Sequence, residues 1–214
     1  DIDGKKTSCD RPGCSLHLHA VLAIRNLGHV FASTAPGIMM GVGSMGDRLR
    51  PYGECDTFIS TDAGLSWRMV ARGPHKHVFA DQGGLLVMAA DAPSIDVVQY
   101  SFDYGTTWTT LALPEAIEPV VLTSVPDGTA LKILLLGGRR AKTAHERYAS
   151  VFIDFAVLSK RKCAQADFER FYPATPHGSC VFGRRQWYLR RKAQADCFVR
   201  DKFHEPQGHD LSLI

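Results

Sequence analysis

The sequence has 214 residues, of which 45% are hydrophobic and 22% are charged, a composition typical of a globular protein with enough apolar material for a core. Its 25 basic residues nearly balance its 22 acidic ones, which argues against a dedicated nucleic-acid binder. No apolar run approaches the length that spans a bilayer, and the polar first residues do not resemble a signal peptide.

Short apolar or alternating runs, separated by Gly, Pro and Asp, predict an all-β fold. These runs are rich in Val, Ile, Phe and Trp, and their spacing is that of successive strands. The continuous apolar run at 85–88 indicates a strand that is buried on both faces. Strands are expected near residues 16–23, 37–43, 57–60, 67–71, 77–80, 85–89, 97–102, 108–111, 120–124, 132–136 and 149–155.

An internal repeat refines this expectation. Residues 60–67 and 101–108 both fit the pattern Ser/Thr-x-Asp-x-Gly-x-Ser/Thr-Trp, and the two copies are 41 residues apart. That period is close to the length of a four-stranded propeller blade. The sequence therefore predicts part of a β-propeller of about three blades, in which a third unit covers residues 119–155 without an intact copy of the motif.

The chemistry of the repeated octamer is structural, and the motif resembles the Asp-box of bacterial sialidases and other propellers. Its Asp can accept hydrogen bonds from the turn, its Gly permits a backbone conformation that other residues resist, and its Trp fills space between strands. We interpret the following residues as Asp-box positions: Ser60, Asp62, Gly64, Trp67, Ser101, Asp103, Gly105 and Trp108.

The six cysteines suggest an oxidising compartment. They form no Cys-x-x-Cys pair, so a zinc ribbon or a thioredoxin-type site is not expected, and their uneven clustering suits disulfides. Six buried free thiols in a cytosolic protein are the alternative. A second, more charged and cysteine-bearing segment starts at Lys160, so we predict one domain over residues 1–159 and another over residues 160–214.

Several motifs in the first domain resemble the Vps10/sortilin family of sorting receptors. They are Cys-Ser-Leu-His-Leu-His at 14–19, Gly-Ser-Met-Gly-Asp at 43–47, Gly-Pro-His at 73–75, Asp-Gln-Gly-Gly at 81–84 and Ile-Asp-Phe at 153–155. In the second domain, Cys163 with Asp167-Phe168, the run from Cys180 to Arg184 and Cys197 are similar to the start of the ten-cysteine module of that family. The sequence Arg-Arg-Lys-Ala-Gln-Ala-Asp-Cys at 190–197 is most similar to that of fungal Vps10 receptors.

The resemblance implies the last three blades of a ten-bladed propeller followed by the first part of the cysteine-rich module, and hence a fragment of a larger receptor. It also implies two disulfides, Cys9 with Cys14 and Cys163 with Cys197. The partner of Cys180 would lie beyond Ile214, and Cys55 has no counterpart that we can place. Because open blade faces need neighbours, we expect the isolated chain to be marginally stable.

Three clusters admit a second interpretation. His17 and His19 share one strand face and could bind a metal with a third ligand, or could simply pack on a blade strand. Asp62 and Asp103 could be catalytic carboxylates, although the repeat favours a role in turns. The basic cluster from Arg184 to Lys192, interleaved with aromatic residues, could bind acidic ligands or nucleic acid, or could be a solvated strand pair.

The expected function is binding of protein or peptide cargo by the luminal part of a single-pass type I receptor. The resemblance implies a receptor that cycles between Golgi and endosome and delivers soluble vacuolar hydrolases such as carboxypeptidase Y. We expect no catalytic residue, metal, cofactor or nucleic acid, and membrane contact only through segments absent from this chain. The expected partners also include the remaining propeller blades and the rest of the cysteine-rich module. Release of cargo on acidification is a further hypothesis, because histidines and carboxylates could change charge.

The rival function is that of an enzyme, a sialidase-like glycoside hydrolase built on Asp-box blades. Such an enzyme would need carboxylates or a Tyr/Glu pair that face one another across a single glycosidic bond, together with an arginine cluster. The sequence shows no such constellation, and the cysteine-bearing segment has no place in it. A purely structural propeller that binds no cargo is a third possibility.

Overall fold

The computed structural model describes most of the chain between Gly13 and Ser212, with backbone alone at Arg184 and at His209–Ser212. The described ranges are 13–19, 34–125, 127–138, 148–173, 184–200 and 209–212. Within them the protein consists of β-strands and short 3-10 turns, with no α-helix, which confirms the predicted all-β class.

Thirteen strands are present in the described part of the chain, and most lie within a few residues of the predicted ones. They are β1 (Ser15–Leu18), β2 (Met39–Gly46), β3 (Asp56–Ser60), β4 (Arg68–Ala71), β5 (His75–Ala80), β6 (Leu85–Ala90), β7 (Ile95–Ser101), β8 (Thr109–Thr123), β9 (Lys132–Gly138), β10 (Tyr148–Asp154), β11 (Phe168–Phe171), β12 (Arg184–Arg191) and β13 (His209–Ser212). Single-turn 3-10 helices lie at Tyr52–Glu54, Asp81–Gly83, Phe155–Leu158 and Gln165–Asp167.

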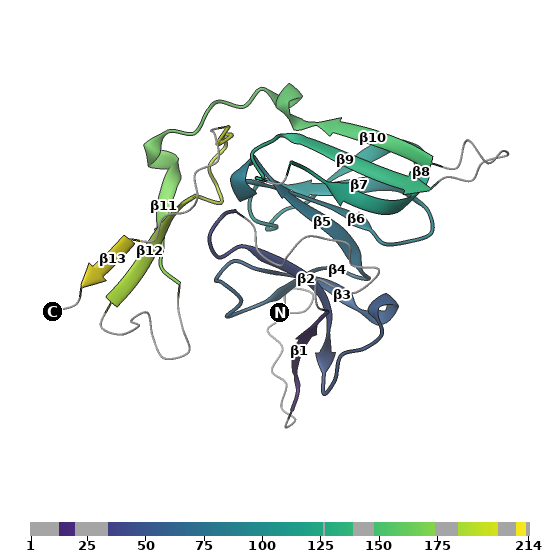
Figure 1. Ribbon diagram of the computed structural model, residues 1–214, viewed down its shortest axis with the longest axis horizontal. Coiled ribbons are helices and arrows are strands. Elements are labelled where there is room, and N and C mark those ends of the chain that lie inside the picture. The colour runs from purple at the N-terminus through teal and green to yellow at the C-terminus, as the bar shows by residue number, and fades with distance from the viewer. Residues whose placement is uncertain are drawn as a thin grey trace.

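The strands form three antiparallel sheets, as Figure 1 shows. The first sheet has the order β1-β2-β3-β4, the second has the order β10-β9-β8-β7-β6-β5, and the third has the order β11-β12-β13. In the first two sheets, consecutive strands pair with one another, which is how a propeller blade is built. These curled sheets are those of a partial propeller, as predicted.

Strand β8 joins two blade units in the second sheet and corrects one prediction. The sequence predicted separate strands at 108–111 and 120–124, whereas a single strand covers Thr109–Thr123. Its first half pairs with β7 and its second half with β9, and the register shifts between Pro119 and Val121. Because proline lacks the N–H that a regular ladder needs, it is accommodated at such an irregularity.

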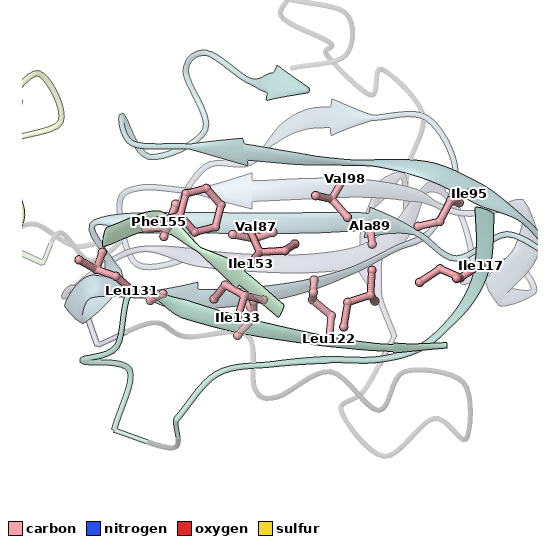
Figure 2. Close-up of a cluster of buried hydrophobic side chains, with 14 of the residues drawn as sticks. Val87, Ala89, Ile95, Val98, Ile117, Leu122, Leu131, Ile133, Ile153 and Phe155 are labelled. Carbon is pink, nitrogen blue, oxygen red and sulfur yellow. The ribbon is translucent and has the colours of Figure 1, made fainter. Parts of the chain in front are cut away.

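The main core lies inside the second sheet, which curls so that side chains from its two halves meet (Figure 2). Val87 and Val98 come from β6 and β7, while Ile133 and Ile153 come from β9 and β10. Phe198, from the C-terminal segment, is fully buried in the same cluster. A second core, which includes Met40, Ile59, Leu86 and Tyr104, joins the first sheet to the second.

Candidate functional site

The first Asp-box turn is closed by its own side chains. The Ser60 hydroxyl donates to Asp62 Oδ1 at 2.8 Å and accepts from the Gly64 amide at 2.8 Å. Ser66 donates its amide to Oδ1 and its hydroxyl to Oδ2 of the same carboxylate, at 2.9 and 2.5 Å. Trp67 completes the turn, because its indole N–H donates to the Gly64 carbonyl at 3.0 Å.

The second turn repeats this arrangement residue by residue. Ser101 donates to Asp103 at 2.7 Å, and the amide and hydroxyl of Thr107 reach the same carboxylate at 2.9 and 2.6 Å. The indole of Trp108 donates to Gly105 at 3.1 Å. Gly105 has a φ of 74°, and a Cβ at this position would lie 2.9 Å from the Ile59 side chain, so the turn requires glycine here.

The electrostatics of both carboxylates suit a structural role. Burial by itself would raise the pKa of Asp62 and of Asp103, but the hydrogen bonds from their own turns outweigh burial and lower it. Both oxygens of each carboxylate already accept donors within the turn. A carboxylate with a lowered pKa and occupied oxygens is a poor general acid, so the hydrogen bonds of both turns favour the predicted role in closing the turn.

The C-terminal segment docks onto the blades through a buried carboxylate. Asp81 lies between β5 and β6, and its two oxygens accept the amides of Val199 and Arg200 at 3.0 and 3.1 Å. Burial raises the pKa of Asp81, while these two amides and the charge of Arg191 act in the opposite direction. These charge-assisted hydrogen bonds attach Val199 and Arg200, more than a hundred residues further along the chain, to the second sheet.

Arg191 is the second part of this docking contact. Its side chain donates to the carbonyls of Gly84, at 2.9 Å, and of Phe102, while its own carbonyl accepts from the Tyr104 hydroxyl at 2.6 Å. Burial also raises the pKa of Tyr104 to about 12, so the phenol is neutral and donates its proton. Arg191 is therefore buried, with only 3% of its surface exposed, and is not solvated.

The neighbouring Arg190 contacts residues that flank strands β2 and β3 of the first sheet, and the same hairpin. It donates to the carbonyls of Pro36 and Thr61 at 3.0 and 2.9 Å, and to the Glu169 carboxylate at 2.9 Å. Its guanidinium also stacks on Phe171, with 4.1 Å between its Cζ and the ring centroid. The sequence pattern did not reveal these two arginines as docking residues, because the acceptors that join them to the blades, Pro36, Thr61, Gly84 and Phe102, are distant in the sequence.

The histidines of β1 and of the residue after it contact backbone and side-chain groups. His17 Nε2 lies 3.2 Å from the Gly46 carbonyl, and His19 Nε2 lies 3.1 Å from the Arg50 carbonyl and 3.4 Å from Cys55 Sγ. Burial raises the pKa of the Cys55 thiol, so this cysteine is a neutral, buried group. Neither histidine belongs to a group of three potential metal ligands in the described ranges.

Cys163 and Cys197 form the disulfide that the family resemblance implies. Together with Asp167 they are the one cluster of potential metal ligands among the residues that the structure describes, and the disulfide occupies both sulfurs. Cys14 is also disulfide-bonded, whereas Cys9, its predicted partner, and Cys180 lie outside the described residues. In the described part, no helix is long and apolar enough to cross a membrane.

A small hollow separates the second Asp-box turn from the C-terminal turn at 193–196. Its volume is about 260 Å³, and its lining includes Tyr100, Phe102, Asp103 and Asp196. Lys160 crosses this region, because its ammonium contacts Asp196 at 2.5 Å and lies 4.0 Å from the centroid of the Phe102 ring. The hollow is smaller than the roughly 300–1,000 Å³ of pockets that enclose drug-sized ligands.

The fold and these turns define a class of protein: Asp-box propeller blades followed by a disulfide-bearing segment that docks on them. Comparison with known proteins agrees. A family model described as sortilin, neurotensin receptor 3, matches residues 1–122, and one described as sortilin, neurotensin receptor 3, C-terminal, matches residues 124–211. The chain belongs to the sortilin/Vps10 family.

Curated relatives carry the name vacuolar protein sorting/targeting protein 10. The one from Mycosarcoma maydis is 47% identical over 98% of this chain, and the one from Aspergillus flavus is 42% identical over 91% of it. The matched region spans only 14% and 13% of the length of those two relatives. The boundary between the two family models falls at the end of strand β8.

Proposed function

We propose that this chain is part of the luminal, cargo-binding region of a single-pass type I sorting receptor. The receptor carries soluble hydrolases, of which carboxypeptidase Y is the model case, from the Golgi to the endosome and vacuole. The observation that most supports this proposal is the match of both sortilin family models in consecutive order along the chain. The name of the relatives, which refers to vacuolar sorting and targeting, agrees with it.

The proposal assigns the blades to residues 1–159 and the cysteine-rich module to residues 160–214. Strand β10, at Tyr148–Asp154, still pairs within the second sheet, while β11, at Phe168–Phe171, begins the third. The Cys163–Cys197 disulfide lies entirely within the second assignment. The Asp-box residues and the disulfides have structural roles in this proposal, and cargo contacts involve the remaining blades and module of the intact receptor.

A binding measurement tests the proposal. The chain is produced through a secretory pathway and immobilised, and the propeptide of a vacuolar hydrolase is passed over it. We expect saturable binding to the longer receptor and weaker binding to the chain alone, neither of which a scrambled propeptide of equal composition reproduces. Absence of saturable binding to the chain and to the longer receptor would contradict the cargo proposal.

The enzyme alternative predicts a different result. If the blades were a glycoside hydrolase, the chain would turn over a fluorogenic glycoside, and Asp103→Asn would abolish that turnover. We expect no turnover above buffer, because both Asp-box carboxylates are occupied within their own turns. Sustained turnover that depends on Asp103 would replace the receptor proposal with the enzyme.

A further inference from the structure

One face of the C-terminal hairpin carries an alternating row of arginines and aromatic rings. Strands β11 and β12 pair in the register Arg170 with Leu189 and Phe171 with Tyr188. Because side chains alternate across a strand, Arg170, Leu189, Trp187 and Arg185 belong to the same face, opposite to Arg190. Figure 1 shows the hairpin projecting from one side of the blades.

Two of the arginines on this face are stacked on rings. The Cζ atom of Arg170 lies 4.4 Å from the centroid of Trp187, and that of Arg185 lies 4.1 Å from the centroid of Tyr172. Stacking orients a planar guanidinium and leaves the N–H donors at its edge available for hydrogen bonds. The face therefore carries two oriented cations, and Leu189, with 48% of its surface exposed, lies beside them.

Neither cation has an acidic partner in the part of the chain that the structure describes. Other basic groups of the same segment are paired: Arg161 contacts Asp167 at 2.6 Å, and Arg190 contacts Glu169 at 2.9 Å. The Nε of Arg185 is in addition buried, with no hydrogen-bond partner among the described atoms.

We propose that this basic–aromatic face binds an acidic segment of a protein partner. Carboxylates accept two N–H bonds from one guanidinium, and two guanidiniums on one face suit two acidic side chains of an extended peptide. The Cys163–Cys197 disulfide belongs to an oxidising, extracytoplasmic environment, which favours a protein ligand over a nucleic acid. The inference goes beyond the hydrolase proposal and does not depend on the identity of the cargo.

Fluorescence anisotropy tests the inference with the full chain and a labelled peptide of alternating glutamate and glycine. The same peptide with glutamine in place of glutamate is the uncharged comparison. We expect the acidic peptide to bind, the affinity to fall with added salt, and the glutamine peptide to bind at least about tenfold more weakly. The double variant Arg170→Gln, Arg185→Gln should lose about tenfold or more in affinity for the acidic peptide.

The matched control removes the same charge elsewhere. Arg72 and Lys132 lie on the blades with most of their side-chain surface exposed, and Arg72→Gln with Lys132→Gln should leave affinity within about twofold. A second variant, Arg170→Lys with Arg185→Lys, keeps the charge but loses the planar, stacked fork, so we expect an intermediate loss. Circular dichroism and thermal melting establish that each variant is folded.

Three results would overturn the inference. The first is an acidic-peptide affinity that the double glutamine variant leaves unchanged. The second is an equal loss in the blade control, which would mean that only net charge matters. The third is binding of a sulfated oligosaccharide without binding of the acidic peptide, which would assign the face to a glycan. Loss of hydrolase propeptide binding with retained acidic-peptide binding would leave this inference standing and remove only the cargo proposal.

Discussion

The propeller blades and the C-terminal hairpin are stabilised by different interactions. Strands β5 to β10 of the blades contribute apolar side chains to one continuous core. Each Asp-box turn is closed by hydrogen bonds within its own eight residues. The hairpin segment contributes few side chains to the core. It is closed by its own disulfide, and Asp81, Arg191 and Phe198 attach it to the blades. Local sequence patterns thus describe the blades well, whereas the hairpin depends on partners that are distant in the sequence.

The largest expected effect comes from Phe198, the one side chain of the described C-terminal residues that belongs to the main core. Phe198→Ala should lower the free energy of unfolding by about 3–5 kcal/mol, because it leaves a cavity among blade side chains. Urea unfolding of the variant and of the parent chain measures this change in the free energy of unfolding. As a control, Phe152→Ala, at a site with 72% of its surface exposed, should change stability by about 0.5 kcal/mol or less. Equal effects of the two variants would mean that the hairpin does not depend on the blade core.

Removal of the disulfide should have the next largest effect. Cys163 and Cys197 are 34 residues apart, and chain-entropy reasoning gives a loss of about 3–4 kcal/mol for Cys163→Ser with Cys197→Ser. Thermal and urea unfolding of the oxidised chain and of the double variant provide the comparison, and mass spectrometry establishes the bond in the parent. A loss below about 1 kcal/mol would show that the C-terminal segment keeps its structure through its hydrogen bonds and the Phe198 contact without the disulfide.

Substitution in an Asp-box should have a smaller effect that is confined to a blade. Asp103→Asn weakens the bonds from Thr107 and should cost about 1–2 kcal/mol at neutral pH. The pKa of Asp103 is lowered in the folded chain, so its contribution is present above the pKa of the unfolded carboxyl and is lost as the pH falls through the folded value. Unfolding measured at neutral and at acidic pH should therefore show a difference between variant and parent that shrinks in acid.

Glu118→Gln, at an exposed position of β8, is the control for this experiment and should leave stability nearly unchanged. Asp62→Asn should behave like Asp103→Asn, because the two turns share their hydrogen bonds. A large difference between the two Asp-box variants would indicate that one turn has a role beyond closure of its blade.

The smallest expected effect is a pH dependence that originates in β5. His77 is buried, and both of its ring nitrogens lack a hydrogen-bond partner among the described atoms. Burial lowers its pKa from 6.5 to about 4, so below pH 6.5 the unfolded chain binds a proton that the folded chain does not. Stability should fall by about 1 kcal/mol between pH 7.5 and 5.5 for this residue alone.

His77→Leu should flatten this part of the pH profile in urea unfolding, while His75, whose pKa burial also lowers, still contributes in the same direction. His17→Gln, at a half-buried position on β1, is the matched control. An unchanged pH profile in His77→Leu would show that the acid sensitivity of the chain lies elsewhere.

The sequence by itself determined the all-β class, the Asp-box octamers and the family. Each of these depends on short-range patterns, such as the alternation of apolar residues and the 41-residue repeat, which physical rules connect to local structure. The sequence did not predict the full length of strand β8, because Pro114 and Pro119 locally favour an interruption of the strand. Only pairing with β7 and β9 around two register shifts allows one continuous strand.

Only the tertiary structure decided which arginines of the basic cluster are buried against the blades and which are stacked on rings of the hairpin segment. Nothing in the local sequence distinguishes Arg185, stacked on Tyr172, from Arg191, buried against the blades. The difference arises because the free energy of a charged side chain depends on which acceptors surround it, and those acceptors, Gly84 and Phe102 for Arg191, come from distant positions. Long-range partners of this kind exist only once the chain has folded.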